Sequence, residues 1–218
     1  MFKAMAESQF PDDTINVKFI GGGGATLKEH WEVGEALREI KSGYWDYVVL
    51  QGQSMLGSRD LTNNDSPKQF YDYARKLNAE IINSGAKTVF FMTWSRKRLP
   101  EQQKYLTKAY QTIAKELGSL LAPVGLVWGK FHEISTIDLY MPDGSHPSKT
   151  GTFLSALTLF GAVFQTIPDD ISGTLYGQEI LRGGKLSIEK TRSCDLSKEQ
   201  VKLLRKAVAD VMFQKEKK

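Results

Sequence analysis

Cysteine is almost absent from this chain of 218 residues. The lone Cys194 has no second cysteine with which to form an internal disulfide, and a zinc site built on cysteine ligands is excluded. No apolar run approaches the length of a membrane span. The first residues, MFKAMAESQF, lack the apolar core of a secretion signal and instead have the spacing of an amphipathic helix. The sequence therefore indicates no membrane-spanning helix and assigns no compartment.

An excess of one charge is also missing. Lys and Arg number 29 against 25 Asp and Glu, so the net charge is only +4. Because the basic residues are spread along the chain, no nucleic-acid partner is expected. Charged and hydrophobic fractions of 25% and 41% are ordinary for a globular protein. With no repeat and no low-complexity linker, we expect one domain over residues 1–218, in which residues 168–218 form an extension with an amphipathic helix that starts near Ser197.

Short β-rich runs alternate with helical patterns along the chain. We predict strands at residues 15–20 (INVKFI), 46–51 (DYVVLQ), 87–94 (KTVFFMTW) and 122–128 (APVGLVW). Unbroken apolar strands between helices are typical of a parallel sheet that is covered on both faces. The predicted fold class is therefore α/β: a three-layer α/β/α sandwich with a parallel, flavodoxin-like sheet.

Capping residues and glycines mark the predicted helices between these strands. One helix follows the four glycines and ends at Gly43, and a second starts at Ser66-Pro67, with serine as N-cap and proline in the first turn. Gly85 and Gly118 stop the second and third helices. The last core helix begins near Ser148. We expect it to bury apolar side chains along its length: Phe153, Leu154, Leu157, Phe160 and Phe164.

Four unusual segments fall in the loops where parallel α/β sheets bind ligands. GGGGAT, QGQS and TWSRK follow predicted strands, and DGSHPS lies between the last strand and the last core helix. Ligands of such sheets bind beyond the carboxyl ends of the strands. This coincidence is the main sequence evidence for a site.

Asp143 and His146 are the strongest candidates for chemistry. A carboxylate three residues before a histidine in a tight turn can accept the Nδ1 proton of the imidazole, which leaves Nε2 as a general base. Pro147 and Ser148 then end the turn and start the helix. The alternative is an Asp–His cap at the helix entry with no catalytic duty.

Two further segments supply candidate donors for a developing oxyanion. A backbone N–H of Gly22 or Gly23 could fill this role, and the alternatives are a loose glycine-rich turn or a phosphate cradle. Gln51 ends an apolar strand, where an amide needs partners; it is either a donor in the site or a structural hydrogen-bonding group. Gln53 is the competing donor. Trp94 either lines a substrate pocket or packs in the core.

The other two histidines, His30 and His132, are interpreted as structural. A metal site built from His132, His146 and Asp143 has no recognised spacing, so no metal ligands are predicted.

The segment DGSHPSKTGTFLSA resembles the last conserved block of the SGNH (GDSL-type) hydrolase superfamily, in which a D-x-x-H-P turn supplies the base and its orienting acid. GGGGATLKEHW resembles the block that contributes a glycine N–H to the oxyanion hole. DYVVLQGQS stands where the family has its Gly-x-Asn-Asp block, with glutamines in place of asparagine. QGQS is closer to the Gln-Gly-Glu-Ser variant of sialate and xylan acetylesterase-like branches. With TWSRK, APVGLVW and LYMPDGSHPS, the whole is similar to an uncharacterised bacterial branch, over residues 1–168.

The resemblance places the family's nucleophilic serine before the helix at residues 1–10, where this sequence has no residues. Three explanations compete: a longer natural protein, an inactive relative, or another serine, with Ser54 in QGQS the nearest candidate. We favour the longer protein, because Ser54 stands in the oxyanion loop rather than at the family's nucleophile position.

The resemblance implies a serine hydrolase of esters, in particular a carbohydrate O-acetylesterase, that needs no metal or organic cofactor. The expected partner is a small-molecule or carbohydrate ester. The main rival is a non-catalytic module that binds a carbohydrate or peptide on the same fold. A weaker rival is a flavodoxin-like nucleotide binder that uses the four glycines.

Overall fold

The computed structural model describes residues 1–54, 56, 66–168, 170–180 and 186–213. The chain divides into two compact units. We call Ile20–Gly125 the sheet unit, and we call Met1–Phe19 together with Leu126–Lys218 the helical unit. No helix in the described part of the chain is both long and apolar enough to cross a membrane.

The sheet unit is built on three parallel strands in the order β1-β2-β3. β1 (Tyr47–Leu50) pairs with β2 (Lys87–Phe91), and β2 pairs with β3 (Leu120–Ala122). Val89 and Phe90 of the middle strand are fully buried. Their burial agrees with the unbroken apolar pattern of a parallel strand.

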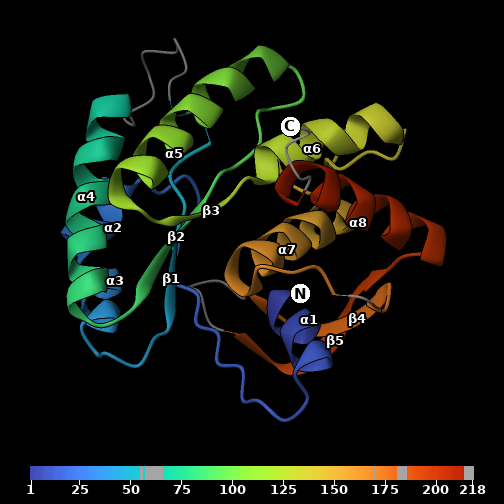
Figure 1. The fold of residues 1–218 in the computed structure, drawn as a ribbon, viewed down its shortest axis with the longest axis horizontal. Helices are drawn as coiled ribbons and strands as arrows, with labels where there is room; N and C mark the ends of the chain where they lie inside the picture. The colour runs from blue at the N-terminus through green and yellow to red at the C-terminus, as the bar shows by residue number, and fades with distance from the viewer. Residues whose placement is uncertain (55, 57–65, 169, 181–185, 214–218) are drawn as a thin grey trace. The chain divides into compact units, whose positions relative to one another are not determined.

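Two long helices of the sheet unit pack on these strands (Figure 1). α4 (Pro67–Asn83) contacts β2, while α5 (Gln103–Leu117) contacts β2 and β3. Both helices stop as predicted, because Gly85 and Gly118 have left-handed backbone angles, with φ of 88° and 60°. The core between helices and sheet is made of apolar and aromatic side chains, among them Phe70, Leu77, Ile81, Leu106, Tyr110 and Ile113.

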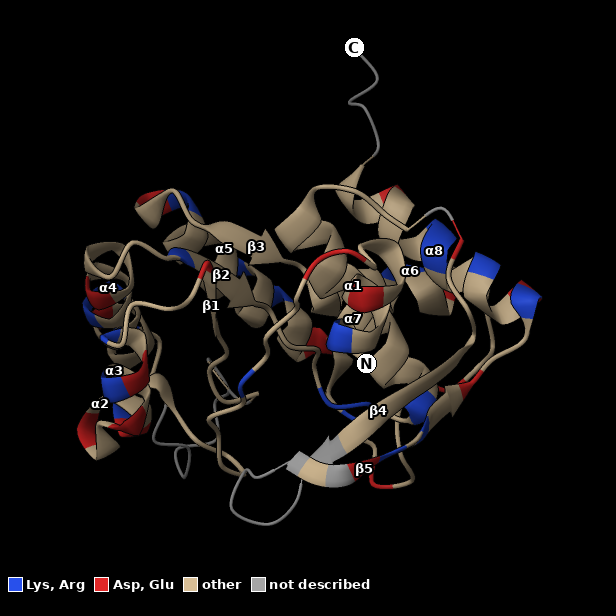
Figure 2. Ribbon diagram, turned by 90° about the horizontal axis from the view of Figure 1, so that it is seen from below, with Lys and Arg blue, Asp and Glu red and all other residues tan. Residues whose placement is uncertain are grey.

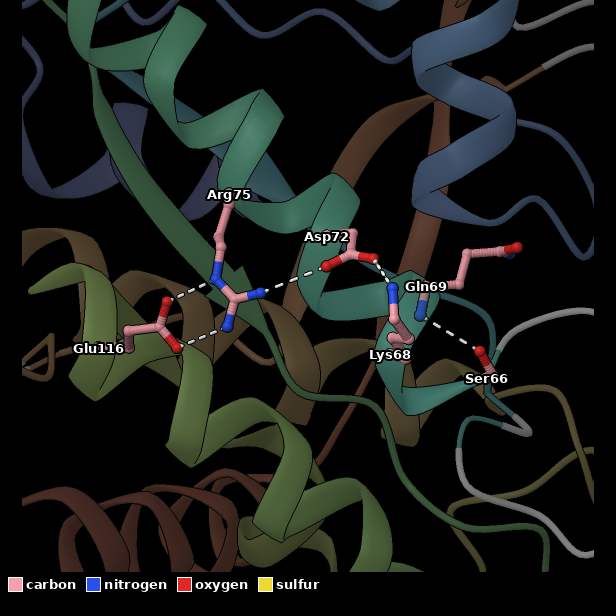
Figure 3. A network of polar contacts seen from close by, with 6 residues as sticks. All are labelled: Ser66, Lys68, Gln69, Asp72, Arg75 and Glu116. Atoms are coloured by element: carbon pink, nitrogen blue, oxygen red, sulfur yellow. Dashed lines mark hydrogen bonds and ion pairs between the residues drawn. The ribbon is translucent and has the colours of Figure 1, made fainter.

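A short polar network joins α4 to α5 on the surface (Figure 3). Arg75 donates two hydrogen bonds to Glu116, at 2.6 and 2.9 Å, and a longer one to Asp72 at 3.4 Å. The hydrogen bonds from Arg75 hold the pKa of Glu116 below its ordinary value. At the start of α4, Ser66 caps the helix by accepting the backbone N–H of Gln69. This cap confirms the predicted helix start.

The prediction of one continuous helix after the four glycines is wrong. Residues of this segment form α2 (Leu27–Val33) and α3 (Glu35–Ile40), which both contact α4. Gly34 separates them with a φ of 76°, a conformation that ends one helix and starts the next. Gly34 therefore breaks the segment that the sequence predicted as one helix.

The helical unit is centred on α7 (Lys149–Phe164), which is buried over most of its length. Its N-cap is Ser148, as predicted, and the Ser148 hydroxyl accepts the N–H of Gly151. α1 (Phe2–Gln9) packs on α7, with stacked rings of Phe2 and Phe164. The amphipathic helix predicted at the start of the sequence is confirmed.

α8 (Lys198–Met212) also packs on α7. Ser197 and Gln200 form a reciprocal capping box at its start, which confirms the helix start predicted near Ser197. Leu204 and Val208 are fully buried on one face. Figure 2 shows lysines and arginines along this helix, and Lys206 pairs with Asp210 one turn later. The exposed lysines of α8 thus lie on the solvated face of an amphipathic helix.

Sequence patterns did not indicate the antiparallel hairpin of the helical unit. β4 (Thr174–Ile180) pairs with β5 (Leu186–Asp195), starting from Thr174 opposite Asp195. Cys194 is buried here, and its thiol contacts the carbonyl oxygen of Gly173 at 3.2 Å. Burial raises the pKa of this thiol.

Two predicted strands are wrong. Residues 15–20 form no strand, and Val17 and Phe19 are 43% and 45% exposed. β3 ends at Ala122, and the next residues belong to α6 (Val124–Ile134), which begins in the sheet unit and continues in the helical unit. An apolar run such as VGLVW fits a buried helix as well as a strand, so periodicity alone did not separate the two.

Candidate active site

Asp143 and His146 lie in direct contact in the helical unit. His146 Nδ1 is 2.6 Å from Asp143 Oδ2, while Asp143 Oδ1 accepts the backbone N–H groups of Ser145 and His146 at 2.8 and 2.9 Å. The His146 side chain is 74% exposed, and the Asp143 side chain is 48% exposed. The tight turn predicted from the spacing of the two residues is therefore present.

The hydrogen bonds to Asp143 keep its carboxylate charged. Contact with His146, followed by the two backbone N–H groups, lowers the pKa of Asp143 to about 2. A carboxylate with this pKa holds no proton at neutral pH, so in the neutral imidazole the hydrogen between the two side chains sits on Nδ1 of His146. The Nε2 lone pair is then left to accept a proton.

A hairpin-like loop carries this pair. Gly144 takes a φ of 65° at its tip, and its N–H bonds to the carbonyl oxygen of Met141. Below the tip, Met141 donates its N–H to the His146 carbonyl at 2.8 Å. Tyr140 and Pro147 form an isolated antiparallel β-bridge. The loop thus places His146 just before α7.

In the sheet unit, Gln51 and Gln53 follow the carboxyl end of β1. Gln51 is exposed and Gln53 half-buried. Between them, buried Gly52 donates its N–H to the hydroxyl of Tyr110 at 2.8 Å, and a Cβ at Gly52 would lie 3.0 Å from the ring of Phe70. Tyr110 therefore holds this loop in place. The sequence did not predict this role, because Tyr110 is one aromatic residue within a helical pattern.

Trp94 follows the carboxyl end of β2, the neighbouring strand, and is half-buried. The side chain of Gln103 holds this loop, since its Oε1 accepts the N–H of Ser95 at 2.8 Å. Gly125 at the start of α6 fits closely against the same loop, where a Cβ would collide with Gln103 and with the Thr93 carbonyl oxygen. No pattern of residue types indicated this close approach.

Gly22 and Gly23 lie in the loop before α2 and are exposed. Neither needs to be glycine for steric reasons, because an added Cβ has no neighbour closer than 4.0 Å; the left-handed φ falls on Gly24, at 74°. The following helix starts with a capping box, in which Thr26 and Glu29 bond to each other. The hydrogen bond from the Thr26 backbone lowers the pKa of Glu29, which places a carboxylate at the start of this helix.

The remaining candidates fall in separate places. Ser54 is half-buried in the turn after Gln53. His30 is half-buried on α2, and burial lowers its pKa. His132 is exposed on α6, and its ring stacks on that of Tyr140. Within the described ranges, no three His, Cys, Asp or Glu side chains are grouped to hold a metal ion.

The structure thus brings two sets of predicted residues together. Asp143 and His146 touch in the helical unit, while Gln51, Gln53 and Trp94 follow neighbouring parallel strands in the sheet unit. Gly22 and Gly23 stand in a third segment, also in the sheet unit. Loops after neighbouring parallel strands share one edge of the sheet, which is where such folds bind ligands.

Comparison with known proteins gives structural matches only. No protein-family model and no curated protein matches the chain. A candidate SGNH hydrolase from Slackia heliotrinireducens matches with 27% identity and a TM-score of 0.52, over 64% of this chain and 79% of its own. LAE5, an alpha/beta hydrolase enzyme from the metagenome of Lake Arreo, Spain, matches with 15% identity and a TM-score of 0.61, over 74% and 78% of the two chains. TesA matches with 14% identity and a TM-score of 0.55, over 74% and 86%.

These matches define the class of the fold. The chain has an α/β fold with a three-stranded parallel sheet that resembles structures of SGNH hydrolases, so the predicted fold class is confirmed. At 14% and 15% identity, TesA and LAE5 contribute the fold alone.

Proposed function

We propose that this protein is an SGNH-type serine hydrolase that cleaves esters. The observation that carries the proposal is the contact of 2.6 Å between His146 Nδ1 and Asp143 Oδ2, on a fold that resembles hydrolases of this class. A carboxylate with a pKa of about 2 orients the imidazole and stabilises the imidazolium that forms during the reaction. An exposed His146 is accessible to a substrate.

The proposed reaction proceeds through an acyl-enzyme. The oxygen of a serine attacks the carbonyl carbon of the ester, and His146 Nε2 takes the proton of that serine. The tetrahedral oxyanion accepts hydrogen bonds from the Gly23 N–H, or that of its neighbour Gly22, and from the amide of Gln51. The bond to the alcohol then breaks, and His146 returns the proton to the leaving oxygen. Water repeats these steps on the acyl-enzyme and releases the acid and the free serine.

The attacking serine of this proposal is either Ser54, in the turn after Gln53, or, as the resemblance in sequence implies, a serine outside residues 1–218. An acetyl ester of a carbohydrate is the proposed substrate. The support for it is the QGQS segment after β1, which resembles acetylesterase-like branches, and the neighbouring loop with Trp94, which offers an aromatic surface for a sugar ring.

Hydrolysis of p-nitrophenyl acetate tests the proposal. The assay compares the 218-residue chain with the same chain preceded by whatever residues the genomic reading frame encodes before Met1. We expect turnover from at least one of the two polypeptides, namely the one that contains the attacking serine. A fluorophosphonate probe followed by peptide mass spectrometry identifies the serine that reacts, which separates an upstream serine from Ser54.

Variants of the active polypeptide test the dyad. His146→Ala should lower kcat/KM by roughly 10²- to 10⁴-fold, the usual contribution of a general base, and Asp143→Asn should also lower it. Asp12→Asn, an exposed carboxylate outside the dyad, should keep full activity. Equal activity of His146→Ala and wild type would refute the proposal. Binding of acetylated sugars without turnover by either polypeptide would favour the non-catalytic module instead.

A further inference from the structure

We propose that Gly151 is a positioning residue for His146: the close contact that its missing side chain allows holds the imidazole against Asp143. This inference rests on the proposed function for the role of His146 as a base. By this proposal, a residue outside the D-x-x-H-P turn helps to set the direction in which His146 Nε2 points.

The loop that carries His146 is tied to α7 through Leu139. The carbonyl oxygen of Leu139 accepts the N–H of Ser148 at 2.8 Å, next to the bond from Met141 to the His146 carbonyl, also at 2.8 Å. Leu139 is fully buried, so this end of the loop is fixed in the core of the helical unit. The position of His146 therefore depends on where Leu139 and the first turn of α7 meet.

Gly151 lies at that meeting point. A Cβ built on Gly151 would collide with the Leu139 carbonyl oxygen and would lie 2.9 Å from the ring of Trp128. Neither neighbour can give way easily. The carbonyl is backbone that accepts the Ser148 N–H, and Trp128 is 1% exposed and packs edge-on against Tyr140 at 4.8 Å. One methyl group must therefore push α7 and the loop apart.

Ser148 gives a second tie between the same two segments. Its hydroxyl accepts the N–H of Gly151 at 3.2 Å and donates to the carbonyl oxygen of Asp138 at 3.2 Å. The loop is thus held at Asp138 and Leu139, both against the first turn of α7. The turn that contains Asp143 and His146 therefore starts and ends at segments that these hydrogen bonds hold together.

The consequence for the dyad follows from its geometry. The bond between Nδ1 and Oδ2 is short, at 2.6 Å, and both side chains are largely exposed, so no surrounding core keeps the ring in place. Displacement of the backbone at Pro147 and Ser148 turns the His146 ring relative to Asp143. A ring without this contact exchanges freely between its two tautomers.

The experiment compares Gly151→Ala with Gly129→Ala. Gly129 is exposed on α6, next to Trp128, and an added Cβ there has no neighbour within 4 Å. The readout is the ¹⁵N chemical shift of the two His146 ring nitrogens at a pH where the ring is neutral. We expect protonation on Nδ1 in the wild type and in Gly129→Ala, and shifts of both nitrogens toward a tautomer mixture in Gly151→Ala. Ser148→Ala should shift them in the same direction by a smaller amount.

An unchanged His146 tautomer in folded Gly151→Ala would overturn the inference, even if that variant were less stable. If Gly151→Ala does not fold, Ser148→Ala decides: mixed tautomers support the inference, and an unchanged spectrum overturns it. These spectra need no substrate. Failure of the proposed function, seen as absent hydrolysis, is therefore separate from failure of the positioning role.

Discussion

At the scale of single residues, the molecule concentrates its chemistry in one turn. Asp143 accepts three hydrogen bonds, from the ring and the backbone of His146 and from the backbone of Ser145. These bonds stabilise its charged form, which is why its pKa falls to about 2 although the side chain is exposed. The backbone bonds alone would make a helix-entry cap. The ring contact is what adds a proton acceptor at Nε2.

We predict that His146→Ala raises the pKa of Asp143 from about 2 toward its ordinary value of 3.8, because the ring is the largest cause of the shift. The pKa should stay below 3.8, since the backbone N–H groups remain. Carboxyl ¹³C shifts recorded against pH measure it. His132→Ala, which removes an exposed histidine of α6, is the control and should leave the pKa of Asp143 unchanged. A pKa of Asp143 that stays at about 2 in His146→Ala would contradict the prediction.

The same lowered pKa predicts how stability depends on pH. A carboxyl whose pKa is lower in the folded state stabilises the fold above its unfolded value, here about 3.8, and this contribution is lost as the pH falls through about 2. The free energy of unfolding of the wild type should therefore drop between pH 4 and pH 2 more than that of Asp143→Asn. Urea unfolding across this range gives the comparison, and parallel curves would show that the turn contributes nothing.

At the scale of elements, local capping decides where helices begin and end. Ser66, Ser148 and Ser197 each accept a backbone N–H at the start of their helix, and left-handed Gly118 ends α5. Each cap satisfies a helix N–H or C=O that has no partner inside the helix. The ion pair between Arg75 and Glu116 then links two such helices across the surface (Figure 3).

We predict that Ser197→Ala lowers the free energy of unfolding by about 1 kcal/mol, the usual cost of losing an N-cap. Here the loss removes the bond from the Gln200 N–H to Ser197 Oγ, while Gln200 can still reach back to the backbone of residue 197. Ser197→Asp keeps an acceptor at the cap and should be close to wild type. Urea unfolding measures both variants. Equal losses in both would mean that the hydroxyl makes a different contact from the cap.

At the scale of the whole molecule, the sheet leaves an apolar strand at its edge. β1 has β2 as its only neighbour among the described strands, and Val49 is 42% exposed. Edge strands usually avoid pairing with other chains because they carry charged residues or proline. The four residues of β1, YVVL, include neither. Such a strand is typical of the interior of a parallel sheet rather than of its edge.

We predict that this edge drives self-association of the 218-residue chain and that Val49→Lys reduces it. Light scattering after size-exclusion chromatography measures the mass as protein concentration rises. Val33→Lys is the matched control, because Val33 is 70% exposed but lies on α2. The prediction fails if both lysine variants change the mass equally, or if the wild type is monomeric at all concentrations.

The amino-acid sequence by itself determined the features that depend on neighbours along the chain. These are the capped starts of α4, α7 and α8, the stops at Gly85 and Gly118, the apolar strands β1 and β2, and the Asp143–His146 turn. The caps, the stops and the turn depend on hydrogen bonds or backbone angles within a few residues, and the two strands were indicated by their unbroken apolar runs, so the residue types and their spacing were enough to predict these features.

Only the tertiary structure decided what depends on contacts between distant segments. The run VGLVW became a helix because Val124, Val127 and Trp128 are buried there, while residues 15–20, equally suited to a strand, found no partner strand among the described residues. The close contacts at Gly125 and Gly151, and the pairing of β4 with β5, are likewise invisible in a pattern of residue types. The physical reason is that pairing and close approach are set by the space between elements, which the order of residues along one element does not contain.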